Sequence, residues 1–326
     1  MGRHTFRKLA LVGAVGAVIA ACGGGSTDLA EGGIGGTGIS TGTVTGFGSV
    51  WVNGVEFETT QATIQKEGMS YEGPGMDRKY LRIGMVVTVQ GDIDADGMRG
   101  IATEIEYSSL LRGRVDQTPA NDNLVVLGQR VNVDTQTNYG GNCNSLDQIR
   151  MGDKVEVSGF YVHDNTTGDY IQGTYIECLS SISVYKITGV IERVENGEFY
   201  VRSLFGELEI QSPDAASLKV GDYVEAQLRM DDYDSRDEYV ALDVSQRPMG
   251  LGEEDVDKAE MEGIVVGGCA TLPCTFSLGL QEVKIDTTTS FSNGKGYTDI
   301  QSGVRLEVEG SVSNGVLIAR EVEFED

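Results

Sequence analysis

Apolar and polar residues alternate in short runs along most of the chain, and one such run occurs four times. Each copy starts at a glycine and has apolar residues three and five positions later, with a polar residue between them. The four copies are Gly84-Val87-Thr88-Val89, Gly152-Val155-Glu156-Val157, Gly221-Val224-Glu225-Ala226 and Gly303-Leu306-Glu307-Val308. Because successive side chains of a β-strand point to opposite faces, this pattern predicts strands with one buried face.

The segments around these strands also repeat. A second strand is predicted after each copy, at residues 102–106, 173–177, 241–245 and 319–323. Each unit opens with a glycine that precedes a Val or Ile: Gly42, Gly113, Gly189 and Gly263. A hairpin follows, and in the first unit Asn53-Gly54 between alternating apolar residues predicts a type I′ turn. The segment before the glycine-led strand, such as 213–218, is long enough for one helical turn.

A unit is therefore roughly five strands in about 70 residues, with a short helix before the fourth strand. This order predicts an all-β chain of four tandem small OB-like β-barrels, and a β-sandwich is the alternative. The predicted domains are repeat 1 (42–107), repeat 2 (108–182), repeat 3 (183–249) and repeat 4 (260–326), with an acidic linker at 250–259. The Gly-, Ser- and Thr-rich residues 22–41 predict a flexible tether.

The amino terminus has the layout of a secretory signal. Arg3, Arg7 and Lys8 precede only 13 apolar residues at 9–21, whereas a membrane span needs about 20. The stretch ends in Ala-Ala-Cys22-Gly23, which resembles the lipobox of bacterial lipoproteins. That resemblance implies cleavage before Cys22, acylation of Cys22 and, with Gly23 in place of Asp, sorting to the outer membrane. An ordinary signal peptide with an incidental cysteine is the alternative.

The amino-acid sequence of repeat 1 resembles that of a known domain family. GTVTGFGSVWVNGVEF at 42–57, LRIGMVVTVQG at 81–91 and ATEIE at 102–106 resemble the bacterial domain-of-unknown-function family 5666. The resemblance is close for repeat 1, good for repeat 2 and loose for repeats 3 and 4. Members of the family are often tandem and often lipoproteins. The family has no established activity or catalytic residues, so the resemblance implies the architecture and leaves the function open.

Composition bears on the partners. Without residues 1–21 the chain has 305 residues, 22 Lys and Arg and 50 Asp and Glu, for a net charge of −28. Such a charge repels phosphate backbones, so no nucleic-acid partner is predicted. No segment after residue 22 is long and apolar enough to span a bilayer as a helix.

Four cysteines remain after Cys22, in a protein predicted to be exported, where disulfides persist. Cys269 and Cys274 flank a turn that contains Pro273, and Cys143 and Cys178 fall in one repeat. We predict these two local pairs among the three connectivities that four cysteines allow. Metal binding is disfavoured because the spacing is not C-x-x-C and no His partner is near.

Candidate catalytic chemistry is sparse. His163 is the only His after the signal, and it is predicted to be solvent-exposed in a turn. Ser-His-Asp and Cys-His arrangements would all depend on it, and no nucleophile-elbow or phosphate-loop motif occurs. No catalytic residue and no enzyme activity are therefore predicted. Carboxylate-pair chemistry stays open, because 50 acidic residues offer many pairs.

One motif suggests a metal. Asp92-Ile-Asp94-Ala-Asp96-Gly97 matches the start of a calcium-binding loop, in which oxygens at alternate positions converge on one cation. The match fails at the twelfth position, which is Thr103, and strands rather than helices flank the loop. The plain interpretation is a hairpin turn in which Asp and Gly are favoured for backbone reasons, and we prefer it. No other cofactor is predicted.

Two surface features complete the picture. The acidic run 231–238 is interpreted as a solvated hairpin tip, with a site for a cation or a basic partner as the alternative. Trp51 alternates with Val50 and Val52, so either the tryptophan or the valines face solvent.

We predict a lipid-anchored, non-catalytic interaction module of the cell envelope that contacts the bilayer through Cys22 and binds an envelope protein. The alternative is a module that binds a glycan, a small ligand or calcium.

Overall fold

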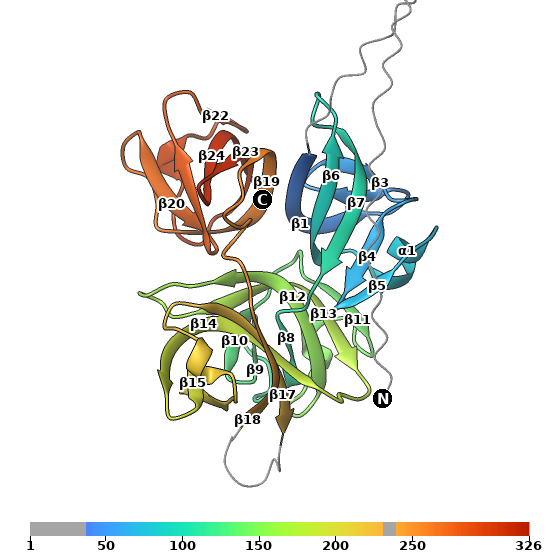
Figure 1. The fold of residues 1–326 in the computed structure, drawn as a ribbon, viewed down its shortest axis with the longest axis vertical. Coiled ribbons are helices and arrows are strands. Elements are labelled where there is room, and N and C mark those ends of the chain that lie inside the picture. The colour runs from blue at the N-terminus through green and yellow to red at the C-terminus, as the bar shows by residue number, and fades with distance from the viewer. Residues whose placement is uncertain (1–36, 231–238, 326) are drawn as a thin grey trace, which may run out of the picture. The chain divides into compact units, whose positions relative to one another are not determined.

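The computed structural model describes residues 37–230 and 239–325 (Figure 1). The signal segment, Cys22 and most of the predicted tether lie outside the described residues, as does the acidic run 231–238. Residues Gly35–Asp326 form one compact unit. Strands dominate the described residues, so the prediction of an all-β chain is confirmed. None of the described helices has the length and apolar character needed to cross a membrane.

Repeat 1 contains a closed ring of five strands. Its elements are β1 (Thr37–Gly46), β2 (Val50–Val52), β3 (Val55–Glu58), β4 (Thr63–Lys66), β5 (Met69–Tyr71), α1 (Met76–Tyr80), β6 (Val86–Ile93) and β7 (Arg99–Tyr107). Strand β1 pairs with β2, β2 with β3, β3 in parallel with β7, β7 with β6, and β6 with β1. This is a five-stranded Greek-key barrel of the OB type.

Repeats 3 and 4 close in the same order. Repeat 3 has β14 (Tyr185–Glu195), β15 (Glu198–Ser203), β16 (Gly206–Gln211), η2 (Ala215–Ser217), β17 (Tyr223–Met230) and β18 (Tyr239–Gln246). Repeat 4 has β19 (Val256–Val266), β20 (Cys274–Leu278), β21 (Gln281–Ile285), β22 (Ser290–Phe291), η3 (Tyr297–Asp299), β23 (Arg305–Ser313) and β24 (Val316–Phe324). In each, the third and fifth ring strands are parallel, and the first strand pairs with the second and fourth.

Repeat 2 follows the same path with one weaker closure. It has β8 (Leu111–Arg114), β9 (Asn123–Val126), β10 (Gln129–Asn132), β11 (Asn138–Gly141), η1 (Leu146–Gln148), β12 (Lys154–Val162) and β13 (Tyr170–Leu179). A single bridge between Val115 and Val126 joins its first and second strands. The prediction of tandem barrels is thus confirmed, and the predicted short helix before the fourth strand is present in every repeat.

The repeated glycine makes the same turn each time. Its φ is positive in all four copies, at 92°, 88°, 92° and 88° for Gly84, Gly152, Gly221 and Gly303. Side chains other than glycine rarely adopt this conformation. The amide of each glycine donates to a carbonyl of the first strand or its end: Val44 (2.9 Å), Val115 (2.8 Å), Ile191 (2.9 Å) and Val265 (2.9 Å). The sequence pattern therefore marks the hydrogen bond that fixes the fourth strand against the first.

The β2–β3 hairpin has the predicted turn. Asn53 and Gly54 both have positive φ, at 50° and 71°, as a type I′ turn requires. Val50 and Val52 are fully buried, whereas Trp51 is 38% exposed. Of the two orientations left open by the sequence, the structure therefore has the tryptophan outside and the valines in the core.

Two predicted boundaries differ from the structure. Strand β1 begins at Thr37, inside the predicted tether, and β19 begins at Val256, inside the predicted linker. Each strand extends along a partner in its own repeat, residues 37–43 along β6 and residues 256–264 along β23, and residues 38–41 also lie parallel to residues 258–261. A Gly- and Ser-rich segment has little intrinsic strand preference, so a partner strand from elsewhere in the chain determines its conformation.

The cysteines form both predicted pairs. Cys143 bonds to Cys178 with a Cα–Cα distance of 5.6 Å, and Cys269 bonds to Cys274 with a Cα–Cα distance of 5.9 Å. Both distances fall in the usual range for disulfides. The first bond links the loop after β11 to β13, and the second closes the turn that precedes β20.

Candidate functional site

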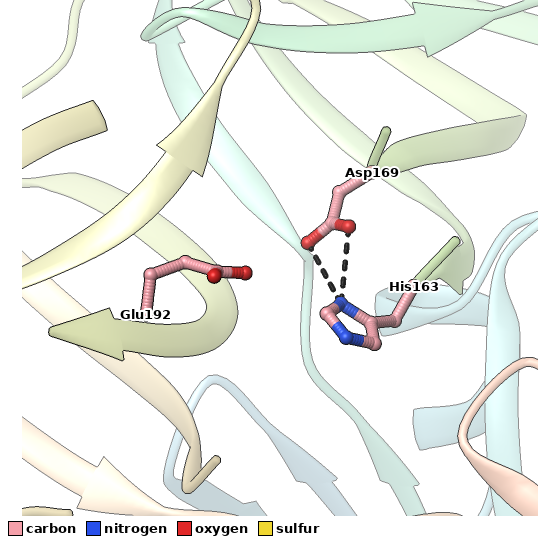
Figure 2. Close-up of side chains that lie close together, drawn as sticks. All are labelled: His163, Asp169 and Glu192. Atoms are coloured by element: carbon pink, nitrogen blue, oxygen red, sulfur yellow. Dashed lines mark hydrogen bonds and ion pairs between the residues drawn. The ribbon is translucent and has the colours of Figure 1, made fainter. Parts of the chain in front are cut away.

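One group of side chains has the composition of a metal site. Among residues 37–230 and 239–325, it is the one place where three His, Cys, Asp or Glu ligand atoms lie within 4.8 Å of one another. Its members are His163 after β12, Asp169 before β13 and Glu192 in β14 (Figure 2). The β12–β13 turn brings the first two together, and β14 of repeat 3 supplies the third.

Asp169 is the centre of this group. Its carboxylate is 2% exposed and lies 3.0 and 3.2 Å from Nδ1 of His163, through its two oxygens (Figure 2). The Tyr161 hydroxyl donates to the same carboxylate, and Arg202 Nη1 lies 2.9 Å from Oδ1. His163 is only 23% exposed, so the prediction of a solvent-exposed histidine was wrong. The sequence predicts that His163 lies in a turn, but it does not show that the turn brings the imidazole against the buried carboxylate of Asp169.

The charges of the group are already paired. Arg202 bridges the two carboxylates, since its Nη2 also lies 2.7 Å from Oε1 of Glu192. A dication would have to displace this guanidinium, which already supplies the positive charge that the carboxylates need. The hydrogen bond to Asp169 raises the pKa of His163 above its ordinary value. The geometry therefore fits an ion-pair clamp between repeats 2 and 3 better than a metal centre.

The predicted calcium loop has the geometry of an ordinary turn. Asp92, Asp94 and Asp96 are exposed, and they do not form a ligand group within the described part of the chain. Oδ1 of Asp96 accepts from the Met98 amide at 3.0 Å. The ammonium of Lys258 donates to the carbonyl of Asp94 at 2.9 Å, so a cation from repeat 4 already lies against this turn. Calcium binding here stays a prediction without support from the arrangement of the carboxylates.

The structure contains a buried ion network that the sequence did not indicate. It consists of Glu67 from repeat 1, Arg112 and Glu156 from repeat 2, and Lys186 and Glu225 from repeat 3. Lys186 Nζ lies 2.9 Å from Glu67 and 3.2 Å from Glu225, and Arg112 lies 3.1 Å from Glu67 and 2.7 Å from Glu156. We call these five residues the inter-repeat ion network.

The environment of the network favours the ionised forms of Glu67 and Arg112. Burial by itself would raise the pKa of Glu67, but the charges of Lys186 and Arg112 outweigh burial and lower it. Tyr107 donates to Glu156 at 3.1 Å, and burial together with the Glu156 charge raises the pKa of Tyr107 well above its ordinary value. Glu156, Lys186 and Glu225 occupy strand positions that alternation assigns to the outer face, so only the packing of the repeats buries them.

Comparison with known proteins gives a family but no activity. A family model described as Domain of unknown function (DUF5666) matches residues 41–106, 112–167 and 270–323. No curated protein matches the chain. Among solved structures, a deletion mutant of the single-stranded DNA binding protein from Thermus aquaticus matches with 12% identity, over 66% of this chain and 96% of that one. The TM-score of 0.19 is too low for an inference from that likeness.

The matched segments fall in repeats 1, 2 and 4, each of which has the strand order described above. Repeat 3 has the same order without a match. Because the three segments cover more than half of the sequence, the chain belongs to the family Domain of unknown function (DUF5666) and carries its domain in tandem.

Proposed function

We propose that this protein is a non-catalytic interaction module of the cell envelope, held at the outer membrane by acyl chains on Cys22. The main observation in support of this proposal is that buried ion pairs join the repeats. The inter-repeat ion network connects repeats 1, 2 and 3 within one compact unit. A preorganised unit offers a partner fixed surfaces and loses little conformational entropy on binding.

Exposed apolar residues recur at an equivalent position and support partner binding. Ile83, Met151 and Val220 stand directly before the repeated glycine and are 46%, 66% and 67% exposed. A single exposed apolar side chain needs no explanation. Here an exposed apolar side chain recurs at the same turn in three repeats, so the protein offers a partner the same kind of apolar contact three times.

The anchor is supported by the sequence around Cys22. A basic start, a short apolar stretch and small residues ahead of a cysteine occur in the order of a lipoprotein signal. Two or more acyl chains hold a protein stably on a bilayer, where one chain would not. Mass spectrometry of the mature amino terminus tests this part: an acylated Cys22 is expected, and an unmodified mature terminus elsewhere would contradict it.

Co-purification from the native host tests the partner. Wild-type protein from gently solubilised membranes is expected to carry a stoichiometric envelope protein, and the Cys22→Ser variant is expected to carry less of it. The double variant Met151→Ser/Val220→Ser should also lose the partner. The matched control Met69→Ser/Ile318→Ser changes two other exposed apolar residues, which are 56% and 38% exposed, and should retain it. A clean wild-type preparation would contradict the proposal.

A further inference from the structure

A cavity of about 240 Å³ lies where repeats 1, 2 and 3 meet. A second cavity of about 150 Å³ adjoins it, and the two share Thr41, Val86, Leu110, Tyr223 and Pro248 among their lining residues. The first has a polar wall, and the second is lined mainly by apolar and aromatic side chains. We call them the polar chamber and the apolar chamber.

The charged groups that line the polar chamber are already ion-paired. Glu106 and Glu225 line it together with Arg247, whose Nη2 lies 2.8 Å from Oε1 of Glu106 and whose Nε lies 3.6 Å from Oε2 of Glu225. Lys186 also pairs with Glu225, at 3.2 Å, and the Ser108 hydroxyl donates to Glu225 at 2.7 Å. Lys186 lies behind the wall and is shared with Glu67, and Arg247 pairs with both lining carboxylates, so neither cation is free for an anionic ligand.

Hydrogen-bonding capacity on this wall is unused. The hydroxyls of Ser109 and Thr188 have no hydrogen-bond partner within the described residues, although the two residues are only 1% and 3% exposed. Both residues line the polar chamber. A buried polar group without a partner is costly, and such groups in native proteins call for an explanation, of which an absent bound molecule is one.

The apolar chamber offers a flat surface beside these polar groups. Phe160, Met261 and Leu278 line it, and Tyr223 lines both chambers. The ring of Tyr223 lies 5.4 Å from that of Tyr161, centroid to centroid, and burial raises the pKa of Tyr223, so its hydroxyl stays neutral. An aromatic ring between polar and apolar walls suits a ligand with one polar and one apolar face.

We propose that the two chambers bind one neutral saccharide ring, with its hydroxyls toward Glu106, Glu225 and Arg247 and its C–H face against Tyr223. Drug-sized ligands occupy pockets of roughly 300–1,000 Å³, so chambers of about 240 and 150 Å³ suit a smaller molecule. The net charge of the chain, −25, disfavours anions, and Arg247 already pairs with the two carboxylates that a cation would need.

Four matched probes test the chemical class. Full-length protein in detergent is titrated with glucose, N-acetylglucosamine, glucuronate and glucosamine, and binding is read by calorimetry and by saturation-transfer NMR. The two neutral sugars are expected to bind, and glucuronate and glucosamine are expected to bind at least about tenfold more weakly, because each charge would lie among groups that are already ion-paired. Tighter binding of either charged probe would overturn the assignment.

Three variants locate the site. Arg247→Gln should weaken sugar binding by about tenfold or more, because hydrogen bonds to charged groups are the stronger ones. The matched control Arg320→Gln removes an exposed arginine of β24 that pairs with Glu309, and it should leave binding unchanged. Thr188→Val is nearly isosteric and removes a hydroxyl that has no described partner, so the variant should fold and bind more weakly.

The proposal is overturned if no neutral sugar binds at about 10 mM, well above a millimolar dissociation constant. It is equally overturned if Thr188→Val, with an unchanged melting temperature, binds as the wild type does. These outcomes would leave the envelope-partner proposal intact, because that proposal is read by co-purification.

Discussion

Lys186 is the most deeply buried charged side chain among the described residues, at 1% exposed. It lies on β14 of repeat 3 and contacts Glu67 of repeat 1 and Glu225 on β17 of its own repeat. Removing one partner of a buried ion pair leaves the other charge uncompensated, and that costs more than the pair itself contributes. Single residues of the inter-repeat ion network therefore control the stability of the whole unit.

Lys186→Met should destabilise the protein by about 3–5 kcal/mol, because Glu67 and Glu225 lose their shared cation. Urea unfolding followed by circular dichroism measures the change. The matched control Lys219→Met alters an exposed lysine and should stay within about 0.5 kcal/mol of wild type. Equal losses in the free energy of unfolding of the two variants would show that the ion pairs of Lys186 add no stability.

At the scale of elements, the outer face of β19, β23 and β24 is unusual. Glutamates lie opposite one another in two rows, Glu262-Glu307-Glu323 and Glu260-Glu309-Glu321. Like charges directly opposite on neighbouring strands are destabilising. Arg305 pairs with Glu262 and Arg320 with Glu309, which relieves part of the repulsion. Protons relieve more of it, since burial and neighbouring carboxylates raise the pKa of Glu260 to about 7 and of Glu307 to about 8.

The glutamate rows predict a stability that falls as the pH rises. Glu307 has a pKa of about 8 in the folded protein against an ordinary value of 4.5, so folding favours its protonated form. Its stabilising contribution is complete below pH 4.5 and is lost as the pH rises through about 8. Urea unfolding should show a loss of about 2 kcal/mol between pH 5 and pH 9, after allowance for solvent screening.

Glu307→Gln should reduce this pH dependence, because glutamine does not titrate, and the part due to Glu260 should remain. Glu282→Gln, at an exposed position on β21, should keep the slope of the wild type and serves as the matched control. If the Glu307→Gln protein loses as much stability between pH 5 and pH 9 as the wild type does, titration of Glu307 is not the cause of the pH dependence.

The two disulfides should differ in their contribution. Cys143–Cys178 closes a sequence separation of 35 residues, and Cys269–Cys274 closes one of 5. From loop entropy alone, the Cys143→Ser/Cys178→Ser variant should lose about 4 kcal/mol and the Cys269→Ser/Cys274→Ser variant about 2 kcal/mol. Denaturant unfolding of both double variants measures the difference, and the reverse order would count against an effect on the unfolded chain.

At the scale of the whole molecule, strand pairing joins distant parts of the chain. The parallel pairing of β1 with β19 places strands of repeats 1 and 4 in one 13-stranded sheet. The amide of Thr43 also donates to Glu262 at 2.8 Å, and Arg305 reaches the Thr43 hydroxyl at 3.1 Å. Repeats 2 and 3 share an 11-stranded sheet through β8 and β14. The unit therefore depends on contacts between repeats as well as within them.

Truncation tests this dependence. A chain that starts at residue 42, where the repeat pattern begins, lacks residues 38–41, which removes the parallel partner of β19 and part of the antiparallel partner of β6. It should melt lower than a chain that starts at residue 36, by about 2–4 °C for each kcal/mol lost. Hydrogen exchange should also speed up at residues 258–261. Identical melting and exchange in the two chains would show that the pairing adds no stability.

The local pattern of the sequence was sufficient for the architecture of each repeat. Strand alternation, the turn at Asn53-Gly54 and the glycine before the fourth strand depend on neighbours in the sequence, so they predicted the barrels and the short helices. The family and the two cysteine pairs could be recognised in the same way.

Tertiary structure alone decided which outward-facing residues became buried. Lys186 and Glu156 occupy polar strand positions, and His163 lies in a turn, so the sequence could not distinguish them from solvated residues. Their burial requires the approach of other repeats, as does the parallel pairing of residues 38–41 with residues 258–261. The alternation of apolar and polar residues indicates which face of a strand points into its own barrel, but it does not indicate what covers the other face.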